Sequence, residues 1–300
     1  MKFIPLLIIG LCIIVILVNP RLRIFINYLP QVLKWTPGDI YKYIKYKKYN
    51  DAPIGCITGY IADSGMPFGS GKTLSSVDKL SRLVKRYDNK IVYHKERYVR
   101  QHIVIFSNIH INIPGAIKIS CIKEYSDNME LLRKSKDRYV CYLHVDEAGS
   151  EFNSRAFAGN FTPDFISDIV TCRHNWSSFY YTAQEFGMVD KLLRSVTIEV
   201  WACSHWGRVF FQRSFLPKSL ENVDDISLLK PQSVKGFFAT DKLYQLYDTY
   251  ARFERMKKDV ESGNVLTPEE IIERRSRDNA AYSSAKFNFK GKRFFKKTKN

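Results

Sequence analysis

The order of apolar and polar positions along the chain predicts an α/β domain preceded by a uniformly apolar run. Residues 3–18 (FIPLLIIGLCIIVILV) carry no charge. Residues 54–61 (IGCITGYI) form a short apolar, β-branched run that is typical of a buried strand. From Leu74 to Tyr87, apolar residues recur every three or four positions, which predicts a helix. Further strands are expected at residues 139–145 (YVCYLHV) and 177–182 (SSFYYT), with a capped helix beginning at residues 162–164 between them.

The apolar run is expected to be an uncleaved membrane anchor occupying residues 1–20. A helix over the sixteen residues 3–18 covers about 24 Å, which fits a thin bilayer. A signal peptide and a buried core helix are the alternatives, but Leu17 to Pro20 offers none of the small residues that signal peptidase requires. Many more basic residues follow the run than precede it, so the positive-inside rule predicts one pass with the bulk of the chain in the cytoplasm.

Residues 21–50 mix basic and aromatic side chains and contain a single acid, Asp39. Such a segment beside a membrane span is expected to lie against anionic lipid. Stacking on single-stranded nucleic acid is the alternative.

A glycine-rich stretch, residues 65–73 (GMPFGSGKT), separates the first predicted strand from the first predicted helix. Strand, glycine-rich turn and helix together form the context of a phosphate-binding P-loop. Gly69, Ser70 and Gly71 would turn backbone N–H groups toward a polyphosphate, and Lys72 would reach the β- and γ-phosphates of ATP. The Thr73 hydroxyl would coordinate Mg²⁺.

One position departs from the usual spacing of this loop. The first glycine is expected at position 66, where the chain has Met66, with Gly65 one residue earlier. A chance GKT in a surface loop is the alternative interpretation.

The strand at residues 139–145 runs directly into Asp146 and Glu147. Asp146 would hold the Mg²⁺ shell and Glu147 would polarise an attacking water, as an ATP-hydrolysing motor requires. A surface turn that happens to be acidic is the alternative. Gln184, after the strand at residues 177–182, is a candidate sensor of the γ-phosphate, although glutamine is often a solvated loop residue.

Two arginines, Arg173 and Arg194, are candidates to reach a neighbouring subunit's nucleotide and stabilise transition-state charge. Surface ion pairing is the blander alternative for both. His144 and His174 lie on the same predicted elements, but no third ligand is spaced for a metal, so we assign them no metal role.

The order of four segments resembles the zonular occludens toxin-like (Zot) family of filamentous-phage assembly ATPases, relatives of the FtsK and HerA pumps. The segments are GSGKT, FSNIHI (residues 106–111), YLHVDEAG (142–149) and CRHNWSSFYYTAQEFGMVDKLLRSV (172–196), and KLYQLYDTY (242–250) is similar to the family's closing motif. The resemblance covers roughly residues 52–250.

The resemblance implies a RecA/ASCE-like P-loop NTPase fold: a mostly parallel sheet flanked by helices. It also implies that Lys72 and Thr73 bind nucleotide, that Asp146 and Glu147 form the metal and water pair, and that Gln184 is the sensor. The implied partners are single-stranded DNA, phage coat or assembly proteins and further subunits of a homo-oligomeric ring, at the inner (host) membrane. Many family members carry their membrane span after the ATPase domain, whereas here the apolar run comes first, as in conjugative coupling proteins.

The C-terminal part is expected to be helical and then basic. Apolar residues from Thr240 to Val260 predict one amphipathic helix, and Thr267 begins another. Beyond Ser283 the chain has seven Lys and Arg, four Phe and no acid, which favours a disordered, phosphate-binding tail over a merely solubilising one. The expected organisation is therefore an anchor (1–20), a juxtamembrane segment (21–50), an ATPase domain (51–236), C-terminal helices (237–282) and a tail (283–300).

The composition restricts the class of function but does not identify the binding partner. Forty-seven Lys and Arg against 30 Asp and Glu give a formal charge of +17, which favours polyanions, either nucleic acid or anionic lipid. Six scattered cysteines without a CxxC pair exclude the familiar zinc and thioredoxin patterns. The expected function is ATP-driven export of single-stranded viral DNA. A conjugative or packaging pump for duplex DNA and a docking protein that binds nucleotide without turnover are the alternatives.

Overall fold

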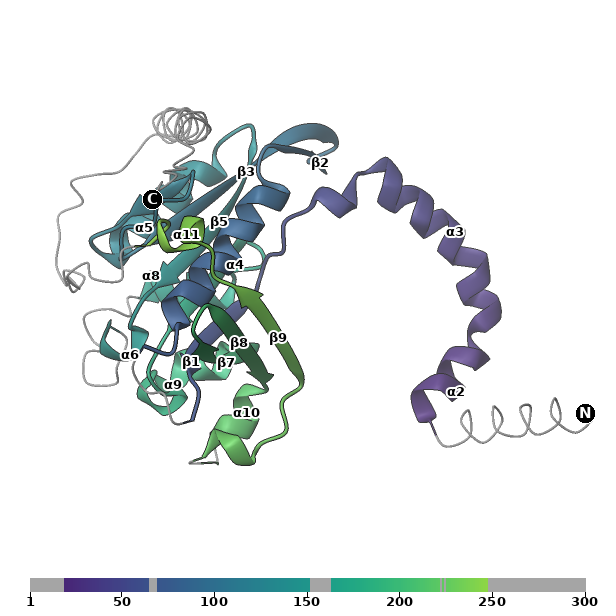
Figure 1. Ribbon diagram of the computed structural model, residues 1–300. Helices are drawn as coiled ribbons and strands as arrows, with labels where there is room; N and C mark the ends of the chain where they lie inside the picture. Colours follow the sequence, from purple (N-terminus) through teal and green to yellow (C-terminus); the bar gives the residue numbers. More distant parts are fainter. Residues whose placement is uncertain (1–18, 65–68, 152–162, 222, 224, 248–300) are drawn as a thin grey trace, which may run out of the picture. The chain divides into compact units, whose positions relative to one another are not determined.

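The computed structural model describes residues 19–64, 69–151, 163–221, 223 and 225–247 (Figure 1). The chain divides after Asp51 into two compact units, Met1–Asp51 and Ala52–Asn300, and each is described by itself. The apolar run expected to be an anchor lies outside the described residues. Within the described ranges, no helix is both long and apolar enough to cross a bilayer.

The first unit consists of α2 (Pro20–Asn27), α3 (Leu29–Lys45) and the short 3-10 helix η1 (Lys48–Asn50). Asn19 caps α2, because its side-chain oxygen accepts hydrogen bonds from the N–H groups of Arg21 (3.1 Å) and Leu22 (3.3 Å). No residue of α2 or α3 is buried, and Trp35 is 66% exposed. The helices therefore present apolar and aromatic surface, and their contact with anionic lipid stays a prediction.

The second unit is built on one sheet with the strand order β2-β3-β5-β6-β1-β7-β8-β9, with β4 paired to β3. The strands are β1 (Ile57–Ala62), β2 (Lys90–His94), β3 (Arg97–Ser107), β4 (Ala116–Lys118), β5 (Arg138–Val145), β6 (Ser177–Thr182), β7 (Glu199–Trp206), β8 (Val209–Phe215) and β9 (Ser233–Phe238). Strands β3, β5, β6, β1 and β7 are parallel to one another. Antiparallel partners extend both edges, so the sheet is mixed around a parallel centre.

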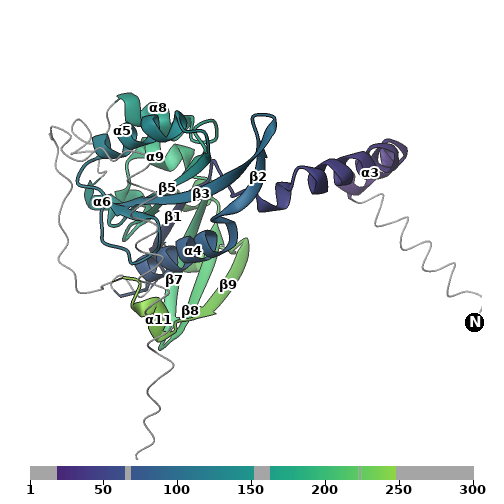
Figure 2. The same ribbon diagram turned by 90° about the horizontal axis from the view of Figure 1, so that it is seen from above.

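Helices cover both faces of this sheet (Figure 2). The helices and 3-10 turns are α4 (Lys72–Tyr87), α5 (Ile122–Arg133), α6 (Ala148–Glu151), α8 (Pro163–Val170), η2 (Phe186–Met188), α9 (Lys191–Val196), α10 (Pro217–Leu220), η3 (Ile226–Leu228) and α11 (Asp241–Tyr244). Apolar residues of α4 and α11 pack on one face, and those of α5, α8 and α9 pack on the other. All six residues of β1 and all eight of β5 are buried, as expected of central parallel strands.

The single helix predicted from Thr240 to Val260 is wrong in its described part. Helix α11 ends at Tyr244, and Tyr247 forms an isolated antiparallel bridge with Ile111. The reason is that this segment docks on the loop after β3: the N–H of Asn112 donates to the Leu246 carbonyl at 2.8 Å. The apolar positions are therefore buried by a non-helical contact. The rest of that helix, the helix at Thr267 and the basic tail lie outside the described residues.

Candidate nucleotide-binding site

Three polar segments meet where the central parallel strands end. The loop after β1 leads into α4, Asp146 and Glu147 follow β5, and Gln184 follows β6. Because β6 lies between β1 and β5, all three ends lie at the same edge of the sheet. Ligands of open α/β sheets bind at the carboxyl ends of strands, so this edge is the candidate site.

The second half of the loop is shaped by two glycines with left-handed backbone angles. Gly69 has φ +68°, and Gly71, directly before α4, has φ +82°. A Cβ added at Gly71 would lie 2.2 Å from the ring of Phe210, whereas one added at Gly69 would meet nothing within 4 Å. Only glycine therefore fits at position 71, while the space beside Gly69 is open.

Side chains in the first turn of α4 form hydrogen bonds with residues that follow β6 and β5. Lys72 Nζ donates to Gln184 Oε1 at 2.8 Å, and Gln184 Nε2 donates to Glu147 Oε1 at 3.0 Å. The Thr73 hydroxyl donates to Asp146 Oδ1 at 2.7 Å. The sequence separations are 112, 37 and 73 residues, so these contacts depend on the fold rather than on local structure.

The acidic pair is fixed by partners that the sequence did not single out. Thr182 donates to Asp146 Oδ1 at 2.7 Å and accepts from the N–H of Glu147 at 2.9 Å. Asn108, after β3, donates to the Asp146 carbonyl and accepts from its N–H at 3.0 and 2.8 Å. Glu147 has φ +52°, a left-handed conformation that costs energy for a residue with a side chain and is characteristic of functional sites.

Burial sets the electrostatics of this cluster. Burial lowers the pKa of Lys72, and the Glu147 and Asp146 carboxylates oppose that effect. Burial and the neighbouring Asp146 charge raise the pKa of Glu147, against the influence of Lys72. Both charged forms are therefore poorly solvated here, and a bound anion that pairs with Lys72 would relieve part of that cost.

The residues present fit a polyphosphate with a divalent cation. Ser70 is fully buried, and its hydroxyl oxygen has no hydrogen-bond partner within the described ranges. Lys72 offers an ammonium group, while Thr73 and Asp146 offer the oxygen ligands that Mg²⁺ takes. No group of three or more His, Cys, Asp or Glu in the described parts of the chain is placed to hold a metal. Mg²⁺ in phosphate sites needs fewer, because it is bound by one or two carboxylates together with the phosphates.

The strands beyond β1 brace the phosphate loop. Asp63, which follows β1, accepts hydrogen bonds from Nε and Nη2 of Arg213 on β8. The Nε2 atom of His205 lies 2.9 Å from the Gly69 carbonyl oxygen, and its ring stacks on Phe210. These contacts could not be predicted from the sequence, because the positions of Arg213 and His205 in the chain do not indicate which loop they contact.

The two candidate arginines lie apart from this cluster. Arg173 precedes β6 and packs beside Gly55, which precedes β1, so it lies at the amino ends of the strands. The six residues of β6 separate that edge from Gln184 by about 20 Å. Arg194 on α9 lies over the Phe186 ring, with Nη1 3.8 Å from Glu221 Oε1. Neither arginine contacts the described part of the phosphate loop, residues 69–73, and a role toward a neighbouring subunit stays a prediction.

His144 has a structural environment. Its ring is fully buried, with Nε2 2.8 Å from the Ser76 hydroxyl and Nδ1 3.0 Å from the Ser107 hydroxyl. These bonds tie α4, β3 and β5 together directly beneath Asp146. His174 is exposed before β6, at the same edge as Arg173.

No protein-family model matches the chain, and no curated protein matches it. Solved structures similar to it include the N-terminal domain of zonular occludens toxin from Neisseria meningitidis, with 18% identity over 65% of this chain and 100% of that one, at a TM-score of 0.38. B204, the DNA-packaging ATPase from Sulfolobus turreted icosahedral virus, matches with 10% identity over 63% of this chain and 100% of that one, also at 0.38. ATPases 2 and 3 of EssC from Geobacillus thermodenitrificans match with 12% identity over 77% of this chain and 45% of that one, at 0.36.

The first of these structures is the N-terminal domain of a zonular occludens toxin, and the sequence motifs resemble the family of that name. All of these identities are below 25% and all of these TM-scores are below 0.5. Activity, substrate and partners therefore rest on the residues of the site.

Proposed function

We propose that this chain hydrolyses ATP. The observation that carries the proposal is the hydrogen-bonded network that joins the first turn of α4 to both acidic residues: Thr73 to Asp146, and Lys72 through Gln184 to Glu147. The strand order β7-β1-β6-β5-β3, with one strand between the phosphate loop and the acidic pair, supports the RecA/ASCE-like class expected from the motifs.

The chain's own residues supply binding and proton transfer in this scheme. The Lys72 ammonium group pairs with the terminal phosphates, which requires that it leave Gln184. Gln184 then remains hydrogen-bonded to Glu147 and can turn its other amide atom toward the phosphate or the water. Glu147 accepts the proton of the attacking water, and its raised pKa makes the carboxylate a stronger base than an exposed glutamate.

Thr73 and Asp146 would hold Mg²⁺ together with the phosphates. When bound, the metal neutralises phosphate charge and orients the terminal phosphate for in-line attack. Thr182 and Asn108 hold the Asp146 side chain and backbone from the two neighbouring strands, so this ligand is positioned before any nucleotide arrives.

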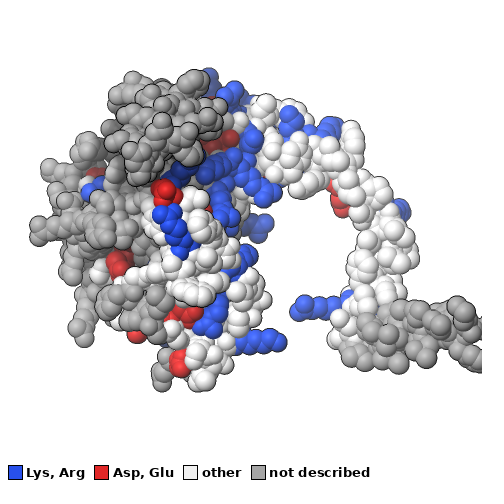
Figure 3. Space-filling view, viewed as in Figure 1, with Lys and Arg blue, Asp and Glu red and all other residues white. Residues whose placement is uncertain are grey.

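We further propose that hydrolysis drives single-stranded DNA across the inner membrane during filamentous-phage assembly, by a ring of subunits anchored through residues 1–20. The family resemblance supports this reading, and so does the distribution of charge. Blue side chains gather over α4 and β9 in Figure 3, where Lys79, Arg82, Lys85, Arg86 and Lys235 are exposed. A basic face on the helix that starts at the phosphate loop suits a polyanionic partner.

The decisive experiment replaces Glu147 by Gln in the full chain and measures phosphate release and ATP binding separately. We expect Glu147→Gln to bind ATP within about twofold of wild type and to lose hydrolysis by a factor of about 10² to 10⁴. Glu185→Gln is the matched control, because Glu185 is exposed and next to Gln184 without contacting the network. Equal hydrolysis by Glu147→Gln and wild type would sink the proposal.

The same assay separates the alternatives. Stronger stimulation by single-stranded than by duplex DNA favours the export of viral single strands. The reverse preference favours a conjugative or packaging pump. A wild-type chain that binds ATP but releases no phosphate is the docking protein without turnover.

A further inference from the structure

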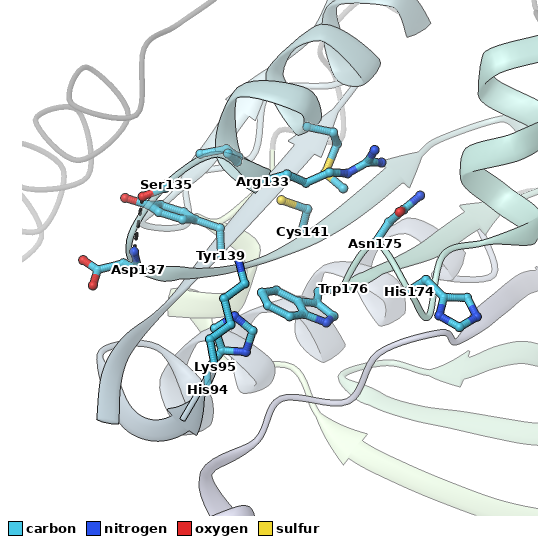
Figure 4. Close-up of a pocket in the computed structure, with 12 residues that line it drawn as sticks. His94, Lys95, Arg133, Ser135, Asp137, Tyr139, Cys141, His174, Asn175 and Trp176 are labelled. Carbon is cyan, nitrogen blue, oxygen red and sulfur yellow. Dashed lines mark hydrogen bonds between the residues drawn. The ribbon is translucent and has the colours of Figure 1, made fainter. Parts of the chain in front are cut away.

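A cavity of about 220 Å³ lies in the second unit, at the edge of the sheet opposite the candidate nucleotide site. It is enclosed by the turn between β2 and β3, the end of α5, the start of β5 and the turn before β6. Figure 4 shows Arg133 on one side and His94 and Lys95 on the other, with the Trp176 ring and the Cys141 thiol between them. Cys141, the lining residue of β5 nearest to Asp146 along the strand, is five positions from it, or about 17 Å.

The rim of the cavity is basic. Lys95 is exposed at the hairpin turn, and no acidic partner for it occurs in the described parts of the chain. Asp168 Oδ1 on α8 accepts hydrogen bonds from Arg133 Nη2 at 2.7 Å and from the amide nitrogen of Asn175 at 3.0 Å. The guanidinium is thereby oriented and keeps further N–H groups for a ligand. Among the described residues that line the cavity, Asp137 is the one acid, and its Oδ2 lies 3.5 Å from Nε2 of His102.

A second sign of positive potential comes from His94. Its pKa is lowered to about 4 by burial and by the charges of Arg138, Lys95 and Arg97. The imidazole is therefore neutral near pH 7 and packs edge-on against Trp176, with ring centroids 4.1 Å apart. Burial, the larger cause, disfavours charge of either sign, whereas the cations Arg138, Lys95 and Arg97 favour an anion beside His94.

The inner lining is apolar and aromatic. Met129 and Leu132 from α5, Tyr139 from β5 and the half-buried Trp176 ring line the space. Small-molecule sites run upward from about 300 Å³, so a cavity of this size has room for a single ring system rather than a longer ligand. A bare phosphate would not use the aromatic lining, and an uncharged ring would not use Lys95 and Arg133.

The Arg173-His174 pair, which the sequence singled out, belongs to this edge. His174 lines the cavity, and Arg173 is exposed directly before it. The sequence makes Arg173 a candidate to reach a neighbouring subunit's nucleotide and gives His174 no metal role. The turn from residue 171 to 176 places both at the amino ends of the strands.

From these observations, we propose that the cavity binds one nucleotide unit, with the base against Trp176 and the phosphate between Lys95 and Arg133. The unit belongs either to a free mononucleotide or to a single strand of DNA. This inference takes its biological meaning from the proposed handling of single-stranded DNA, but it names a surface separate from the phosphate loop.

The test measures binding by the full chain in nonionic detergent, in a Lys72→Ala background that weakens the phosphate-loop site. The probes are a fluorescein-labelled single strand of about twelve thymidines and unlabelled dTMP as competitor. We expect Lys95→Ala to weaken binding of the strand about fivefold and to reduce the slope of log affinity against log salt by about one. We expect Trp176→Phe to weaken binding of the strand. We also expect it to remove the part of the quenching of intrinsic tryptophan fluorescence, on ligand binding, that comes from the Trp176 ring.

Lys134→Ala is the matched control, because Lys134 is exposed one residue from Arg133 but pairs with Glu130 (2.8 Å) and does not line the cavity. Competition by dTMP at concentrations comparable to the strand identifies a free nucleotide as the ligand, and its absence identifies the strand. Thermal unfolding of each variant verifies that it is folded.

The proposal is overturned if folded Lys95→Ala and Trp176→Phe bind both probes as Lys134→Ala does. That outcome leaves ATP hydrolysis untouched. Conversely, a chain with Lys72 intact that hydrolyses no ATP contradicts the proposed function, while weakened binding by the cavity variants would still support this site.

Discussion

At the scale of single residues, the Asp146 carboxylate is the point where the site is most tightly specified. Its Oδ1 atom accepts from both Thr73 and Thr182, and Asn108 bonds to its backbone on both sides. The sequence predicted Asp146 and Thr73 as candidates from their places after a strand and a glycine-rich loop. It indicates no role for Thr182 or Asn108, although Asn108 lies within the FSNIHI segment. A single hydroxyl or amide side chain at a strand end forms no recognisable sequence motif.

Replacing Thr182 by Val tests this arrangement. The change keeps the shape but leaves the Glu147 N–H and one Asp146 acceptor site unsatisfied in a buried position, so we expect a loss of about 1–3 kcal/mol in the free energy of unfolding. We also expect kcat for ATP hydrolysis to fall at least tenfold, because both acidic residues lose a positioning partner. Urea unfolding and steady-state phosphate release measure the two effects.

Thr182→Ser supplies the rescue for this experiment, since it restores the hydroxyl without the methyl group. Its stability and kcat are expected near those of wild type. If Val and Ser variants behave alike, the hydroxyl does not position the acidic pair.

At the scale of secondary-structure elements, the central strands could be predicted and the edges could not. The run at residues 177–182 coincides with β6, and residues 139–145 differ from β5 by one residue. Both strands are buried along their whole length, as central parallel strands are, and residues 139–145 form a nearly continuous apolar run. The sequence does not predict the hairpins β2–β3 and β7–β8 or the edge strand β9. The order of their polar and apolar residues is set by contacts with distant parts of the chain, such as that of Phe210 with Gly71.

The junction between the phosphate loop and α4 gives the prediction at this scale. We expect Gly71→Ala to destabilise the chain more than Gly69→Ala. Both positions have positive φ, so each substitution costs about 1–2 kcal/mol in backbone strain. Only at Gly71 does the new Cβ also meet the Phe210 ring, at 2.2 Å.

Chemical unfolding of the two variants side by side isolates the cost of the contact with Phe210, because the cost of backbone strain at positive φ is common to both. Equal loss of stability would mean that β8 does not brace the loop. Gly71→Ala is also expected to reduce ATP binding more strongly, since the start of α4 must move to relieve the contact.

At the scale of the whole molecule, charge and hydropathy predict an orientation of the chain relative to a membrane. The formal charge of +17 is spread over both units, while residues 3–18 carry none. In the first unit, the exposed Trp35, Tyr41 and Ile44 alternate with lysines along α3. Such a segment on its own binds anionic lipid reversibly and in a salt-dependent way. A transmembrane helix stays in the bilayer irrespective of salt. Extraction with salt therefore distinguishes a transmembrane anchor from surface binding to anionic lipid.

We expect the full chain to stay in the membrane fraction after extraction with high salt and with alkaline carbonate. Replacing Ile9 and Ile14 by Arg should release it, because each arginine at the centre of a span costs about 2.5–3.5 kcal/mol of insertion free energy. The control replaces Ile24 and Phe25 of α2 by Arg, which adds the same charge just outside the apolar run. That control should remain in the membrane after carbonate. Release of the wild-type chain by carbonate would instead mean that only the basic, aromatic helices hold the protein to lipid.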